Sequence, residues 1–194
     1  MKRIDLKKEF REGLKQIKDS RKFIYFIIFL FFGFSIMGYF VTPSEALSAQ
    51  IFEYIKQLIE KTKDFNLFEL IGFIFLNNLK SSFIGLFSGL FFGILSLIHG
   101  ILNGYILGFV SFYSVAENGL LSLWKILPHG IFELPAIFIS LGLGLKLGSF
   151  MFVKNKIPFL RRNILGSVKA FFLIILPLLL IGAIIEGLLI FAVN

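Results

Sequence analysis

Residues 23–41 read FIYFIIFLFFGFSIMGYFV, a run of apolar and small residues that contains no charged side chain. An apolar run of 18 or more residues is long enough to cross the hydrocarbon core of a membrane. A helix on the surface of a soluble protein would instead show a polar face on every turn. The run therefore predicts a transmembrane helix. Because 22 residues rich in charge precede it, we interpret it as a retained signal anchor rather than a cleaved signal peptide.

The rest of the chain has the same character. Hydrophobic residues make up 57% of the sequence and charged residues 16%, whereas a soluble domain carries roughly 25% charged residues. The sequence predicts an all-α, polytopic transmembrane helix bundle of about five spans, with kinks at Pro135 and Pro177. The predicted spans are 23–41, 81–98, 101–116, 128–151 and 167–193.

The pair of spans between residues 81 and 116 has two interpretations. The run from about 67 to 98 is longer than one straight span, and the polar cluster 77–82 divides it into a lead-in helix and a span. The segment that follows is short, and its junction at 99–104 carries no Lys or Arg. The two segments therefore form either two full spans or a re-entrant hairpin enclosed by protein.

The charges are unevenly distributed along the chain, and their distribution predicts its orientation. Residues 1–22 hold nine Lys and Arg residues and four acidic residues. Residues 154–162 hold four Lys and Arg residues and no acidic residue. The segment 42–66 is balanced, with three Lys and four acids. By the positive-inside rule, the N-terminus and 154–162 lie in the cytoplasm and 42–66 outside the cell membrane. The basic segments suit anionic lipid headgroups rather than nucleic acid.

Two segments predict amphipathic helices. In residues 1–22 the apolar side chains Leu6, Phe10, Leu14 and Ile17 share one helical stripe, and most of the basic residues lie off it. This helix is expected to lie in the inner headgroup region with its apolar side toward lipid, or else to dock a partner protein. Residues 43–63 repeat the pattern and predict a second interfacial helix on the outer side.

Small residues recur at intervals of four and predict close helix packing. Residues four apart share a helix face, so a row of glycines lets another backbone approach closely. Gly130 offers the same approach next to a candidate polar site. The glycines expected at packing faces are Gly85, Gly89, Gly93, Gly100, Gly104, Gly108 and Gly130.

A few polar side chains within the spans are the candidates for function, because ionisable groups in hydrocarbon are costly. They are His129, Glu133, His99, Glu186, Asn77, Asn78 and Asn103. His129 and Glu133 are four residues apart, so imidazole and carboxylate can share a hydrogen bond on one helix face. This pair fits a buried clamp, a lining for proton, ion or polar-solute passage, a partner contact, or two ligands of a metal site with His99 as the third.

The sequence lacks the motifs of the common enzyme classes. There is no cysteine, and no nucleophile elbow, phosphate loop, dinucleotide fingerprint or His-Glu-x-x-His zinc motif. We therefore expect a protein that is not an enzyme, with no catalytic residue, no metal and no cofactor.

Three stretches give the chain a recognisable pattern: Asn77-Asn78 followed by Gly85, Gly89 and Gly93; Asn103-Gly104 followed by Gly108; and His129-Gly130-Ile131-Phe132-Glu133-Leu134-Pro135. With these stretches the chain resembles the stage II sporulation protein M family of bacterial and archaeal membrane proteins, over most of residues 23–193. The founding member of that family acts with cell-wall-degrading partners during engulfment of the forespore. Most of its relatives occur in organisms that form no spores.

These observations lead to two hypotheses for function. In the first, the chain is a non-enzymatic membrane protein that organises or recruits partners through its amphipathic helices. In the second, it is a small transporter or channel lined by His129, Glu133, His99 and Glu186. The expected partners are membrane lipids and membrane or envelope proteins, and not nucleic acid; self-association of the chain stays open.

Overall fold

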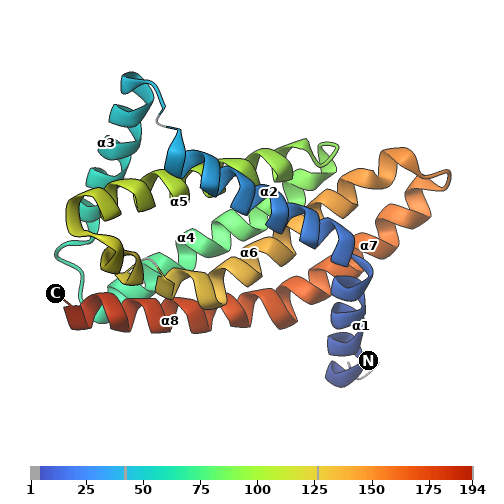
Figure 1. The fold of residues 1–194 in the computed structure, drawn as a ribbon. Helices are drawn as coiled ribbons and strands as arrows, with labels where there is room; N and C mark the ends of the chain where they lie inside the picture. The colour runs from blue at the N-terminus through green and yellow to red at the C-terminus, as the bar shows by residue number, and fades with distance from the viewer. Residues whose placement is uncertain (1–4, 42, 126, 194) are drawn as a thin grey trace.

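The computed structural model describes residues 5–41, 43–125 and 127–193, and the side chains of 124–132 and 193 lie outside the description. Within this part of the chain, five helical segments are long and apolar enough to cross a membrane. They run side by side as a bundle (Figure 1). The segments are α2 (Arg21–Phe40), α4 (Leu67–Phe87), α5 (Ile94–Asn118), α6 (Leu127–Gly148), and α7 (Lys156–Ala170) continuing into α8 (Leu176–Val193). The predicted all-α membrane bundle is confirmed.

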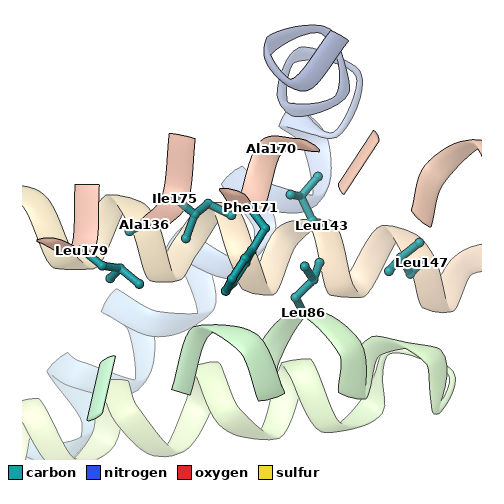
Figure 2. Close-up of a cluster of buried hydrophobic side chains, with 8 residues drawn as sticks. All are labelled: Leu86, Ala136, Leu143, Leu147, Ala170, Phe171, Ile175 and Leu179. Atoms are coloured by element: carbon teal, nitrogen blue, oxygen red, sulfur yellow. The ribbon is translucent and has the colours of Figure 1, made fainter. Parts of the chain in front are cut away.

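Helix α6 lies at the centre of this bundle. In its apolar window 56% of the residues are buried, against 22% to 33% in the windows of the other spans. Its buried side chains contribute to two separate cores. Phe138 and Leu141 pack with Ile24, Ile27 and Phe31 of α2. The other core joins α6 to α4 and to the α7–α8 segment, and Figure 2 shows its side chains: Leu86, Ala136, Leu143, Leu147, Ala170, Phe171, Ile175 and Leu179.

Two amphipathic helices lie at opposite ends of the bundle. Helix α1 (Leu6–Asp19) precedes α2, and α3 (Glu45–Thr62) follows it. In Figure 1 both run across the direction of the long helices, α1 at the end where the chain starts and α3 at the end where it finishes. The Asp5 side chain caps α1 by accepting from two backbone N–H groups, and Asn66 and Glu69 form a capping box that starts α4.

The polar cluster 77–82 does not interrupt the chain as predicted. Helix α4 runs through it without a break and ends only at Phe87, where the short 3₁₀ helix η1 (Ser88–Leu90) follows. The reversal lies at Phe92 and Gly93, whose φ angles are 60° and 75°. Glycine adopts this left-handed conformation at no steric cost. The predicted span bounds of 81–98 and 101–116 are therefore wrong. The structure has two long antiparallel helices instead, α4 (Leu67–Phe87) and α5 (Ile94–Asn118).

The basic segment 154–162 is also more ordered than a loop. Helix α7 begins at Lys156, and Pro158 fits there because backbone N–H groups of the first turn have no partner within the helix. Near Pro177 the chain forms the π-helical turn η4 (Phe171–Ile175) before α8. A wider turn next to proline accommodates a ring that cannot donate a backbone hydrogen bond.

Glycines mark the closest helix contacts. A Cβ on Gly104 would lie 2.3 Å from the carbonyl oxygen of Phe31, and one on Gly108 would lie 1.9 Å from that of Ser35, so α2 rests directly on α5. A Cβ on Gly89 would meet the Gly144 carbonyl oxygen of α6. Gly85 and Gly93 also face α6, through Leu141 and Leu145, whereas Gly100 has room for a methyl group. Gly130 lies outside the described side chains.

Candidate functional site

Three helices bring polar side chains together inside the bundle. Glu133 of α6 lies close enough to Glu186 of α8 and to Asn78 of α4 to interact with both. Both carboxyl side chains are buried, with 4% of each residue exposed, and Asn78 is half-buried. We call these three residues the carboxyl cluster. Sequence reasoning named all three, but it paired Glu133 with His129, whose side chain lies outside the described residues.

The chemistry of the carboxyl cluster follows from its hydrogen bonds. Ionised carboxylates only accept hydrogen bonds, so a bond between Glu133 and Glu186 requires a proton on one of them. The amide group of Asn78 donates to Glu133 without needing a proton. A proton shared by the two carboxyl groups would join α6 to α8, and Asn78 would tie α6 to α4. The cluster is able to clamp the bundle, and it is able to accept or release that proton.

A second polar contact lies one helical turn away along α4. The hydroxyl group of Ser81 is 2.7 Å from Nε2 of His99 and links α4 to α5. Ser81 is three residues from Asn78, so the two side chains are neighbours on the surface of α4. Asn103 is exposed, and its amide donates to the His99 carbonyl oxygen within α5 at 2.8 Å. Asn77 is exposed as well.

Of the candidate metal ligands, His99 and Glu133 lie within the described residues and the side chain of His129 lies outside them. Among the described residues, no group of three or more His, Cys, Asp or Glu side chains is arranged to hold a metal ion. His99 bonds to Ser81, and Glu133 lies near Glu186 and Asn78. The predicted third ligand of a His129–Glu133 site is therefore engaged in another contact.

Helix α1 uses its polar face to dock on α7, a contact that sequence reasoning missed. The amide group of Gln16 donates to Oδ1 of Asn163 at 3.0 Å, and Gly13 lies against the backbone of Ala170. Lys169 forms ion pairs with Glu9 and Glu12, and this bonding holds the pKa of the Glu12 carboxyl below its usual value. The signal in the sequence was a small residue within the polar face of an amphipathic helix.

The apolar stripe of α1 is correspondingly turned away from the protein. Leu6, Phe10 and Leu14 are 68%, 42% and 46% exposed. Only Ile17, the last member of the predicted stripe, packs against the buried cores. An exposed apolar stripe on a helix that crosses the end of the bundle is typical of a helix lying on a membrane surface.

The fold and the carboxyl cluster together define a polytopic helical membrane protein whose interior helices are joined by buried polar groups. The stage II sporulation protein M family matches residues 25–189, which is most of the chain. The chain belongs to this family, as its asparagine, glycine and His-Gly-x-x-Glu patterns indicated. No curated protein and no solved structure is similar enough to match it.

Proposed function

We propose that this chain is a non-enzymatic membrane protein that organises or recruits partner proteins at the membrane surface. The observation that carries the proposal is the placement of two amphipathic helices at opposite ends of one helix bundle (Figure 1). Each presents apolar side chains that the bundle leaves uncovered. Exposed apolar surface of this kind marks sites of interaction with proteins or membranes.

Helix α3 is the stronger candidate for a partner surface. None of its residues is buried, and Leu47, Tyr54 and Ile59 are 44%, 55% and 62% exposed. Its orientation is nevertheless held, because the Phe52 ring packs on Tyr113 of α5 with a centroid distance of 4.8 Å. The ammonium of Lys61 lies 5.2 Å from the centroid of the Phe73 ring of α4. An uncovered surface on a fixed helix requires little ordering when a partner binds.

The orientation that we infer places α1 and the start of α7 in the cytoplasm and α3 outside the cell membrane. This follows from the excess of Lys and Arg in residues 1–22 and 154–162. Both segments lie at the same end of the bundle, opposite α3 (Figure 1), which supports the assignment. Envelope proteins are therefore the expected partners of α3, and inner-leaflet lipid is expected beneath α1.

Photo-crosslinking in living cells tests this proposal. A photoreactive amino acid at Tyr54 or Ile59 is expected to give discrete protein adducts, and the same group at Ile36 of α2, which is 62% exposed, is expected to give none. The charge-introducing variant Leu47→Glu should remove the adduct at Tyr54 while leaving the unfolding temperature of the purified protein unchanged. Equal adducts at Tyr54 and Ile36 would refute a specific partner surface on α3.

The carboxyl cluster favours a second candidate function, proton-coupled passage of an ion or polar solute. Carboxyl groups within a membrane are rare, and they often belong to proton relays. Glu133→Gln keeps the shape of the side chain and removes its titration. In reconstituted vesicles this variant should keep its fold and lose proton flux that the unmodified protein shows. Absence of flux with the unmodified protein would rule out this candidate and leave the first unaffected.

A further inference from the structure

A polar cavity lies where α1 meets the end of α6 and the middle of α7, and neither of the functions above uses it. Its volume is about 350 Å³, within the range of small-molecule sites. It stands at the level where the first span begins, because Asp19 lines it and α2 starts at Arg21. The lining residues are Glu12, Lys15, Gln16, Asp19, Lys146, Arg162, Asn163, Leu165, Gly166 and Lys169.

The cavity carries an excess of positive charge even after its internal ion pairs are counted. Lys169 is neutralised by Glu9, at 2.6 Å between Nζ and Oε2, and by Glu12. Lys15, Lys146 and Arg162 then remain on the wall. They outnumber the negative charge of Asp19 and the one that is left when Glu9 and Glu12 share a single lysine. A site with this balance attracts an anion rather than a cation.

Lys146 places a buried positive charge on the wall of the cavity. Only 8% of it is exposed, and a buried ammonium is costly unless an anion compensates it. Asp19 attracts its charge from α1, but Arg162 repels it from α7. Among the described residues, none forms a hydrogen bond or a close ion pair with its ammonium. The side chain lines the cavity, so an anion bound there would compensate its charge.

We propose that this cavity binds the phosphate group of an anionic phospholipid headgroup. A guanidinium and an ammonium converging on one space fit phosphate oxygens, because Arg binds them through paired hydrogen bonds and Lys through its charge. Basic pockets between membrane helices are recurrent sites for such headgroups. Leu165 lines the cavity and is 55% exposed, so it offers an apolar surface to the acyl chains, which a free phosphate ion lacks.

The test is lipid binding to the full-length protein in neutral detergent, measured by native mass spectrometry with equal amounts of phosphatidylglycerol and phosphatidylcholine. The unmodified protein should retain phosphatidylglycerol preferentially. Arg162→Gln and Lys146→Met should each lower that preference about tenfold, the loss expected for one hydrogen bond to a charged group. Lys154→Met removes the same charge from an exposed position outside the cavity and should leave the preference within about twofold.

Three outcomes would overturn the proposal. Equal retention of both lipids by the unmodified protein would show that the cavity does not select an anionic headgroup. An equal loss in Lys154→Met and Arg162→Gln would mean diffuse attraction to basic residues rather than a pocket. Displacement of the lipid by millimolar inorganic phosphate alone would assign the cavity to a free anion. Arg162 is exposed, so Arg162→Gln should fold. The test therefore stays decisive even if Lys146→Met does not fold.

Discussion

Gly89 in the turn after α4 lies directly against the backbone of Gly144 in α6, so closely that a Cβ atom on Gly89 would come within 2.0 Å of the Gly144 carbonyl oxygen. No side-chain rotation relieves a clash with backbone, so the two segments would have to separate. The contact is reinforced from the other side, since a Cβ on Gly144 would lie 2.4 Å from the carbonyl oxygen of Gly85. Direct backbone contact with the end of α4 and the turn after it therefore fixes the position of α6.

The first prediction concerns this contact. Gly89→Leu should lower the free energy of unfolding by about 3 kcal/mol or more, because overpacking against backbone exceeds the usual cost of a filled core. Gly33→Leu is the matched control, since no atom lies within 4 Å of the Cβ that it introduces. Thermal unfolding in detergent measures both. A Gly33→Leu variant that unfolds at the lower temperature of the two would contradict the assignment.

The second prediction concerns the bond between Glu133 and Glu186. At neutral pH the infrared spectrum should contain the carbonyl band of a protonated carboxylic acid, and Glu133→Gln should remove or shift that band. Glu133→Ala and Glu186→Ala should each destabilise by about 1–3 kcal/mol, because each leaves a buried polar partner behind. The double variant should cost clearly less than the sum of the two. Additive costs would mean that the carboxyl groups do not interact.

The third prediction is a pH dependence of the contact between α1 and α7. The pKa of Glu12 is lowered by its bond to Lys169, so its contribution is complete above the ordinary Glu pKa of about 4.3 and is lost as the pH falls through the lowered folded value. The chain has no cysteine, so spin labels at cysteines introduced for Arg11 and Leu165 report this contact alone. The label distance should lengthen in acid.

Glu12→Gln provides the control for this dependence. It cannot titrate, so it should weaken the contact at neutral pH and show a smaller further change in acid. Glu9 also forms an ion pair with Lys169, so Glu12→Gln should weaken the contact without abolishing it. A distance that stays the same at every pH in both proteins would show that the ion pair does not hold α1 in place.

The fourth prediction concerns orientation. A cysteine replacing Pro158 should be protected from a membrane-impermeant thiol reagent in intact cells, and a cysteine replacing Tyr54 should react with it. Permeabilised cells serve as the control, because both positions are exposed and should then react. Labelling of position 158 from outside intact cells would reverse the inferred topology.

The sequence was sufficient for the bundle and for most helix positions because these depend on local patterns. Apolar runs of spanning length and glycines four apart are read directly along the chain. The continuity of α4 through Asn77–Ser82 was not predictable in this way. It depends on contacts supplied from elsewhere, since Ser140 of α6 donates to the Ser82 carbonyl oxygen and Asn78 reaches Glu133. Tertiary partners make a polar segment helical where local preference favours a break.

The carboxyl cluster shows the same limit. Sequence spacing identifies neighbours three or four residues apart, so it pointed Glu133 toward His129. The side chain of His129 lies outside the described residues, and within them Glu133 lies near Glu186, which follows it by 53 residues. Only the packing of α8 against α6 brings these two together. The docking of α1 through its polar face could not be predicted for the same reason. Helical periodicity shows which residues share a face, but it does not show what that face contacts.

The placement of Glu133 in the central helix has a consequence for biogenesis. The chain is made from its N-terminus, so α6 enters the membrane after α4 has already delivered Asn78 and before Glu186 exists. At roughly 5–20 residues per second, the ribosome needs about 3–10 s to reach Glu186. During this interval α6 is complete and α8 is not yet made. A chain stalled before α8 therefore has the helix of Glu133 without Glu186, and completion of α8 brings the two carboxyl groups together.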